Sequence, residues 1–71
     1  MTSATITIRL NGADRQLTAG LTVTALLSEL GLGSQPVLVE LNGKALFPRE
    51  FAATILASND SVEVIRIVAG G

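Results

Sequence analysis

Four residue types that often take part in chemistry or aromatic stacking are absent from the chain: cysteine, histidine, tryptophan and tyrosine. Without cysteine there is no disulfide, thiol nucleophile or thiolate metal site, and without histidine the commonest general base and metal ligand are missing. Five basic and six acidic residues give a net charge of −1 with no basic run, so the composition argues against a nucleic-acid partner. Few side chains remain with which the chain could act as an enzyme.

Long apolar runs are also missing, because no stretch approaches the roughly 18 residues that a membrane-spanning helix needs. The opening residues MTSATITIRL lack the basic start and long apolar block of a signal peptide. We therefore expect a cytoplasmic protein without a membrane partner. With 71 residues, of which 48% are hydrophobic, the chain is long enough for one domain with one core.

Two segments have the pattern of a β-hairpin. Residues 4–10 and 37–41 place aliphatic side chains at alternate positions, which is typical of a half-buried strand. Each is followed by an Asn-Gly pair, which suits a type I′ turn because both central residues of that turn need positive φ. We therefore expect return strands over 14–18 and 44–46, and a last strand over 61–68.

The pattern changes to a helical period between the two hairpins. Aliphatic side chains recur at the i, i+3, i+4 and i+7 spacing of one helix face, at Val23, Leu26, Leu27 and Leu30. Thr22 is placed to cap the N-terminus of this helix, and Gly31 with Leu32 to end it in a Schellman-like motif.

The segment after the second hairpin has a weaker pattern. Pro48 can open one helical turn, since its fixed φ suits the first helical position. Phe51, Ile55 and Leu56 are further candidates for the core. The turn-rich residues SNDS at 58–61 should lead into the last strand.

The order of these elements predicts an α+β fold of the β-grasp type. Parallel strands need a crossover connection, and the only long helix lies between the two hairpins. The simplest arrangement is a mixed sheet of about five strands, with the helix across one face and the last strand beside the first. We expect residues 1–68 to form this domain and 69–71 to form a flexible Gly-Gly tail. The helix stripe should pack on inward-facing strand residues, namely Ile6, Ile8, Val39, Leu41, Val62 and Val64.

The side chains offer only weak candidates for catalysis. Asp60 and Glu63 have the chemistry of a carboxylate pair, but a turn residue and a solvent-facing strand residue explain them better. Residues 31–35, GLGSQ, follow a helix and not a strand, so they lack the context of a phosphate-binding loop. The neighbours Arg49 and Glu50 are most simply solvated. We identify no catalytic side chain, no metal site and no bound cofactor.

One reactive group remains at the end of the sequence, the α-carboxylate of Gly71. Gly70 and Gly71 have no Cβ, so they suit entry into a narrow active site of another protein. Chain ends are often disordered, but here the strand-like segment runs almost to the glycines. A carboxylate becomes electrophilic when it is joined to AMP, and a sulfur or nitrogen nucleophile can then open the anhydride. The sequence thus predicts a carrier whose terminus is modified by a partner enzyme.

Strand alternation also predicts an apolar patch on the face of the sheet away from the helix. If Val62 and Val64 face the helix, then Ile65 and Ile67 face away from it, and Leu38 shares their side. A sheet face open to solvent usually carries polar residues, so this patch beside the tail suggests a docking surface. The competing interpretation is that isolated apolar residues are common on protein surfaces.

Several motifs resemble those of the bacterial thiamine-biosynthesis sulfur carriers, the ThiS family. They are the ELNG turn, the PREFAATIL stretch from Pro48, the D-x-V-E strand from Asp60 and the final Gly-Gly. The segment LTVTALLSELGL is also similar to the helix of that family, so the resemblance covers nearly the whole chain. The two glycines alone are weakly specific, because ubiquitin and the molybdopterin-synthase small subunit share them.

The resemblance implies a function for the terminus. In that family a ThiF-type enzyme adenylates the terminal carboxylate with ATP, and sulfur from a sulfurtransferase or cysteine desulfurase route displaces AMP to leave a thiocarboxylate. Thiazole synthase then takes the sulfur to build the thiazole of thiamine. The resemblance implies that Gly71, preceded by Gly70, carries the sulfur. It also implies that partners dock on the sheet face with Leu38, Ile65 and Ile67, and that ATP is consumed by the partner.

Three other functions fit parts of the pattern. The ending Ala69-Gly70-Gly71 resembles the molybdopterin-synthase small subunit, although the Pro-Pro pair that usually precedes the tail of that subunit is missing. A ubiquitin-like protein modifier also fits, although the single lysine, Lys44, leaves little scope for lysine-linked chains. In a β-grasp binding module the glycines would be incidental, and a ferredoxin is excluded because no cysteine can hold a cluster.

Overall fold

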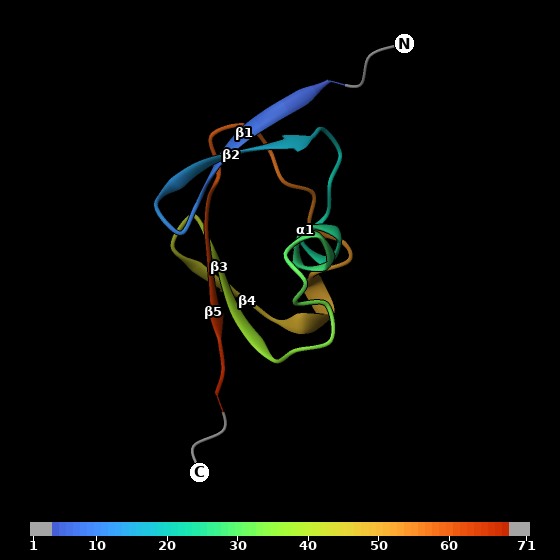
Figure 1. Ribbon diagram of the computed structural model, residues 1–71, viewed down its shortest axis with the longest axis vertical. Helices are drawn as coiled ribbons and strands as arrows, with labels where there is room; N and C mark the ends of the chain where they lie inside the picture. The colour runs from blue at the N-terminus through green and yellow to red at the C-terminus, as the bar shows by residue number, and fades with distance from the viewer. Residues whose placement is uncertain (1–3, 69–71) are drawn as a thin grey trace.

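The computed structural model describes residues 4–68. Within these residues, two β-hairpins flank a short helix, and a 3₁₀ turn precedes the last strand (Figure 1). The elements are β1 (Thr5–Leu10), β2 (Ala13–Thr18), α1 (Val23–Glu29), β3 (Val37–Leu41), β4 (Lys44–Leu46), η1 (Pro48–Glu50) and β5 (Ser61–Arg66). No helix in this part of the chain is long and apolar enough to span a membrane.

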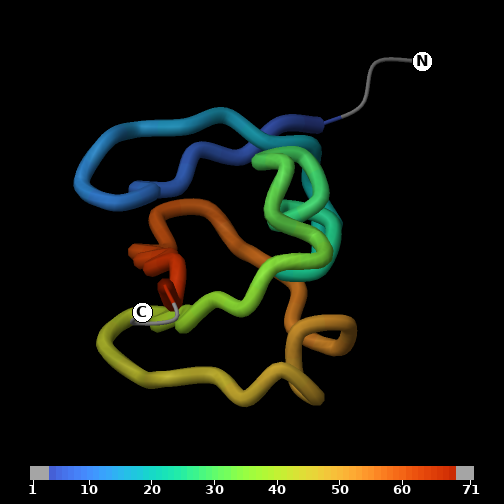
Figure 2. Tube along the Cα trace, turned by 60° about the horizontal axis from the view of Figure 1, so that its bottom comes forward, coloured from blue at the N-terminus to red at the C-terminus, as the bar shows by residue number. Residues whose placement is uncertain are grey.

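The strands form one mixed sheet in the order β2-β1-β5-β3-β4. The last strand, β5, runs parallel to β1 and antiparallel to β3, so it joins the two hairpins. Figure 2 shows this arrangement, with β5 lying between the N-terminal hairpin and the second hairpin. The mixed five-strand sheet with the last strand beside the first is therefore confirmed.

Both Asn-Gly pairs form the tight turns that their sequence predicts. Asn11 and Gly12 have φ angles of 50° and 84°, and Asn42 and Gly43 have 51° and 85°. Positive φ at both central residues is the requirement of a type I′ turn, and it explains why asparagine and glycine occupy these positions.

The two turn asparagines also hold β5, a role that the sequence did not reveal. The side chain of Asn11 accepts a hydrogen bond from the N–H of Val64 (2.8 Å) and donates one to its carbonyl (3.3 Å). The side chain of Asn42 accepts from the N–H of Ser61 (2.8 Å) and donates to the carboxylate of Asp60 (3.0 Å). Each hairpin therefore fixes the last strand through its turn as well as through its strand.

Helix α1 begins and ends at the predicted residues. Thr22 Oγ1 accepts a hydrogen bond from the backbone N–H three residues further on (3.1 Å), which caps the N-terminus. At the other end Gly31 has a φ of 75°, and its N–H donates to the carbonyl of Ser28 (3.0 Å). The N–H of Leu32 donates to the carbonyl of Leu27 (2.8 Å), which completes a Schellman motif.

The core lies between α1 and the inner face of the sheet, as predicted. The buried residues are Ile8, Leu17, Val23, Leu26, Leu27, Val37, Val39, Leu56, Val62 and Val64. Four further predicted core residues are partly buried against this cluster, namely Ile6, Leu30, Leu41 and Phe51. The core therefore fills the space between one helix and the sheet, with the short edge strand β4 contributing the partly buried Leu46.

The prediction is wrong for Ile55, whose side chain is 63% exposed. This residue forms an isolated antiparallel bridge with Thr22, and the N–H of Leu56 donates to the carbonyl of Leu21 (2.9 Å). Side chains alternate between the two sides of an extended segment, so only one of two adjacent residues can face the core. Leu56 takes that position, and Ile55 points away.

Candidate functional site

Gly70 and Gly71, the residues predicted to carry sulfur, lie outside the described residues. The structure describes the segment that leads to them. The N–H of Ile67 donates a hydrogen bond to the carbonyl of Pro36 (3.0 Å), which extends the contact with the β3 side by one residue beyond β5. In Figure 1, β5 runs to the end of the sheet opposite the start of β1.

β5 is held by neighbours on both sides along most of its length. It pairs with β3 over the whole of that strand, and with β1 at Ser61 and Val62. The side-chain amide of Asn11 extends the contact on the β1 side as far as Val64 through two hydrogen bonds. The strand that precedes the glycines is therefore fixed to both hairpins.

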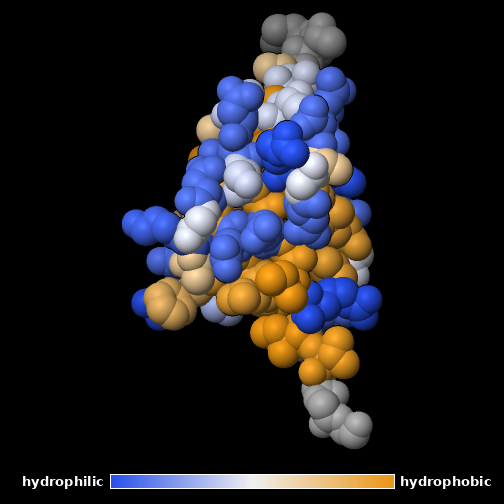
Figure 3. Space-filling view, turned by 90° about the vertical axis from the view of Figure 1, so that its left-hand side faces the viewer, coloured by the Kyte–Doolittle hydropathy of each residue, from blue (hydrophilic) through white to orange (hydrophobic). Residues whose placement is uncertain are grey.

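The outer face of the sheet, away from α1, is apolar beside the end of β5. Leu38 of β3 and Ile65 of β5 are directly opposite each other in the register, and 39% and 50% of their surfaces are exposed. Ile67, beyond the end of the strand, is 56% exposed. Figure 3 shows apolar atoms gathered on the lower half of this face, while polar atoms cover the upper half. Leu38, Ile65 and Ile67 are called the outer patch below.

Ile67 also lies at a groove between the loop after α1 and the η1 turn. The groove has a volume of about 540 Å³, and Leu32, Pro36 and Phe51 are among the side chains that line it. Ile67 lies beside Pro36, whereas Leu38 and Ile65 are register partners on the adjacent strands β3 and β5. Ile67 therefore lies where the outer patch meets this groove, just beyond the end of β5.

Phe47 is an exposed aromatic residue that the sequence analysis did not single out. Its side chain is 58% exposed, and the guanidinium of Arg49 lies over its ring at 4.6 Å from the ring centroid. The carboxylate of Glu50 accepts a hydrogen bond from the N–H of Phe47 (2.9 Å). Arg49 and Glu50, expected to be only solvated, thus both contact Phe47.

Two acidic residues sit next to the outer patch. Glu40 of β3 is directly opposite Glu63 of β5, two register positions from the pair formed by Leu38 and Ile65 and therefore next to it on the same face. Like charges directly opposite each other on a sheet repel. Within residues 4–68 neither carboxylate takes part in an ion pair.

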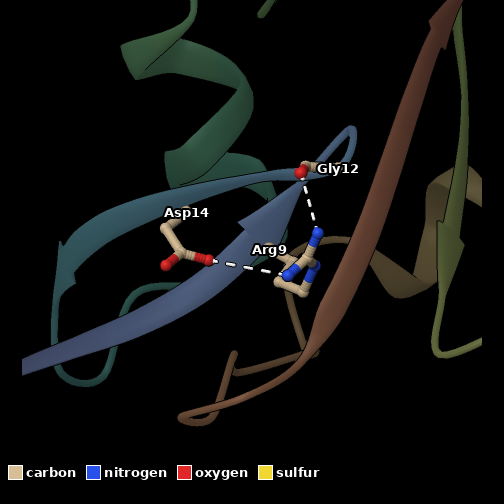
Figure 4. A network of polar contacts seen from close by, with 3 residues as sticks. All are labelled: Arg9, Gly12 and Asp14. Carbon is tan, nitrogen blue, oxygen red and sulfur yellow. Dashed lines mark hydrogen bonds and ion pairs between the residues drawn. The ribbon is translucent and has the colours of Figure 1, made fainter.

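On the polar half of the outer face, the charged side chains of Arg9 and Asp14 contact each other. Figure 4 shows Arg9 of β1 donating a hydrogen bond to the carbonyl of Gly12 (2.9 Å), with its guanidinium 4.0 Å from the carboxylate of Asp14 on β2. These contacts are all within the first hairpin. This half of the face has the composition of a surface that meets water.

Asp60 has a structural role in its turn. Its carboxylate accepts hydrogen bonds from the N–H of Ala57 (2.8 Å) and from the side chain of Asn42 (3.0 Å). The GLGSQ segment ends α1, as its glycine at position 31 shows. Among residues 4–68 no group of three or more acidic residues is placed to hold a metal ion.

The chain is similar to two kinds of known protein. It is 36% identical over 62 residues to the thiazole synthase of Paramagnetospirillum magneticum, and this match covers 87% of the chain but only 19% of that protein. It is 34% identical over 71 residues to the ycf40 protein of Porphyra purpurea, and both chains are covered in full. The chain therefore spans about a fifth of the thiazole synthase that it matches.

A solved structure and a family model agree with this similarity. The crystal structure of the thiamine biosynthesis protein ThiS from Geobacter metallireducens is 35% identical and has a TM-score of 0.80. The comparison covers 93% of this chain and all of the Geobacter chain. The ThiS family model matches residues 8–71. This chain belongs to the ThiS family.

Proposed function

We propose that this protein is a sulfur carrier for thiazole formation in thiamine biosynthesis, with its cargo on the carboxylate of Gly71. The observation that carries the proposal is the ThiS family match, which runs from residue 8 through the two final glycines. The Geobacter metallireducens protein of the same fold is described as a thiamine biosynthesis protein, and the Paramagnetospirillum relative as a thiazole synthase. The first description supports a role in thiamine biosynthesis, and the second supports the thiazole as the part that is made.

In the proposed reaction the carboxylate is activated and then exchanged. A ThiF-type enzyme joins the carboxylate of Gly71 to AMP from ATP, and pyrophosphate leaves. A sulfide equivalent, supplied by a sulfurtransferase or cysteine desulfurase route, attacks the carbonyl carbon, and AMP leaves as a thiocarboxylate forms. Thiazole synthase then takes the sulfur. ATP is a substrate of the activating enzyme in this scheme, and the chain is a co-substrate and not an enzyme.

The fold supports a carrier that presents its terminus to other proteins. β5 is bonded into the middle of the sheet, and the glycines follow it closely in the sequence. The six residues from Arg66 to Gly71 span about 20 Å when extended, at ~3.3–3.6 Å per residue. We infer that residues 1–68 form the domain that stays outside the partner, while 69–71 form the tail that enters its active site in the cytoplasm.

The outer patch is the proposed contact surface for these partners. Leu38, Ile65 and Ile67 are exposed large aliphatic residues next to the segment that leads to the glycines. Burying apolar surface of this kind against another protein is favourable, at roughly 25 cal/mol per Å². A partner bound there would hold the tail close to its own active site.

The proposal is tested by the intact mass of the protein after incubation with a ThiF-type enzyme, ATP and a sulfur donor. We expect a mass gain that corresponds to the replacement of one oxygen by sulfur, located on Gly71 by fragmentation. Incubation without ATP is the control and should give no gain. An unchanged mass under conditions in which an established ThiS protein is converted would contradict the proposal.

A further inference from the structure

The outer patch extends across a third strand through Phe47. Leu46 of β4 pairs with Val39 of β3, and the backbone of Phe47 is still extended, with φ −80° and ψ 148°. The alternation of β4 therefore continues through Phe47, which brings its ring to the outer side, level with Leu38. The exposed apolar surface thus follows one line across β4, β3 and β5, from Phe47 through Leu38 to Ile65.

The ring of Phe47 is held in place although it is exposed. Arg49 lies over one face of the ring at 4.6 Å, and Glu50 binds the backbone N–H of the same residue at 2.9 Å. Both contacts come from the η1 turn that follows directly. A side chain that is already ordered loses little entropy on binding, and aromatic residues are frequent hot spots of protein interfaces.

The acidic pair Glu40 and Glu63 lies beside this apolar line. It indicates the charge that a partner surface needs in order to fit there. Glu40 and Glu63 are opposite each other on adjacent strands and form no ion pair within residues 4–68. A basic side chain brought between them would remove a like-charge repulsion and gain two attractive contacts. Asp14 in the first hairpin differs from this acidic pair, because its carboxylate already lies near the guanidinium of Arg9.

We propose that the outer face of β4, β3 and β5 binds the activating enzyme through Phe47 as an aromatic anchor. The enzyme surface that fits this face has an apolar pocket for the ring and one basic side chain placed between Glu40 and Glu63. This inference rests on the proposed function, because that function supplies the partner. It goes further by naming the residue that anchors the contact and the charge that the partner must carry.

The aromatic part is tested by the dissociation constant of the complex with a ThiF-type enzyme, measured by titration calorimetry without ATP. Phe47→Ala should weaken binding by about tenfold or more, as truncation of an aromatic hot spot does. Ile55→Ala is the matched control, because Ile55 is an equally exposed aliphatic residue located beside the N-terminus of α1. Equal affinities of the two variants, both folded by circular dichroism, would overturn the assignment of Phe47.

The charged part is tested by the salt dependence of the same dissociation constant. Wild-type binding should weaken as NaCl rises, and the double variant Glu40→Gln/Glu63→Gln should bind more weakly with a smaller salt dependence. Asp14→Asn/Glu29→Gln changes the net charge equally at other places and should behave as wild type. An identical salt dependence in both double variants would overturn the basic contact.

These outcomes are separable from the proposed function. Pyrophosphate release by the wild-type chain with the same enzyme and ATP reports whether the terminus is adenylated at all. If the wild type is adenylated and Phe47→Ala is adenylated with unchanged KM, the docking surface is wrong and the carrier function stands. If the wild type is not adenylated, the carrier function itself is wrong.

Discussion

The two halves of the outer sheet face obey the same strand alternation but expose opposite chemistry. On the first hairpin, the outward positions hold polar residues such as Thr7 and Arg9, and Arg9 contacts Asp14 across the hairpin. On β3 and β5 the outward positions hold Leu38 and Ile65. Both halves pack on the same core, so alternation decides which side a residue takes. The kind of residue then indicates what that side meets, which is water in one half and, as we propose, a partner in the other.

The largest expected effect on stability comes from a substitution in the core, on which both halves of the sheet pack. Leu27 is buried between α1 and the sheet, so Leu27→Ala should lower the free energy of unfolding by about 2–5 kcal/mol. That is a large part of the ~5–15 kcal/mol that stabilises a small domain. Chemical denaturation measures the change. Ile65→Ala should cost far less, because Ile65 is half exposed, and equal costs would mean that the inner and outer sides have been wrongly assigned.

A charge placed in the apolar half should weaken partner binding, whereas the same charge in the polar half should not. Ile65→Asp puts a carboxylate at the centre of the proposed interface, where it must lose its water. We expect at least about a tenfold loss of affinity for the ThiF-type enzyme, which corresponds to 1.4 kcal/mol. Thr7→Asp is the control on β1. Similar affinities of the two folded variants would show that the partner does not contact β5.

The connection between the halves can be weakened without changing either face. Asn11→Gly keeps a residue that tolerates positive φ but removes both side-chain hydrogen bonds to Val64. We expect a loss of about 1–3 kcal/mol in the free energy of unfolding. Asn59→Gly is the control, because Asn59 also has positive φ (71°) and its backbone N–H bond to Thr7 survives the change. A cost for Asn11→Gly no greater than that of the control would contradict the role of the amide.

The smallest effect is expected in the polar half itself. Asp14→Asn removes an ion pair with Arg9 whose side chains are 75% and 61% exposed and 4.0 Å apart. Exposed pairs contribute little, so the free energy of unfolding should change by no more than about 0.5 kcal/mol. A substantially larger change in thermal unfolding would mean that this half depends on its surface charges for stability.

Much of the fold follows from local patterns in the sequence. Positive φ is so strongly favoured by Asn-Gly that both hairpin turns were predicted, and Thr22 and Gly31 marked the two ends of α1. The error at Ile55 has a simple cause. Two adjacent aliphatic residues in an irregular segment cannot both face the core, and the sequence does not say which one does.

The parts of the candidate site that could not be predicted from the sequence depend on contacts between residues distant in the chain. Asn11 and Val64 are 53 positions apart, so no local pattern indicates that the turn holds the last strand. Glu40 and Glu63 come together only once the register of β3 and β5 is known. The exposure of Phe47 could not be predicted from the sequence, because it depends on where β4 ends. Leu38 and Ile65 were correctly assigned to the outer side from alternation alone.

The central claim, that the Gly71 carboxylate is the reactive group, is tested most directly by deleting Gly71. Adenylation is measured as ATP–pyrophosphate exchange catalysed by a ThiF-type enzyme, with the wild-type chain and the shortened chain compared at equal concentration. We predict exchange with the wild type and none with the shortened chain, although both unfold at the same temperature and bind the enzyme through the same outer face. Equal exchange with the two chains would contradict the account.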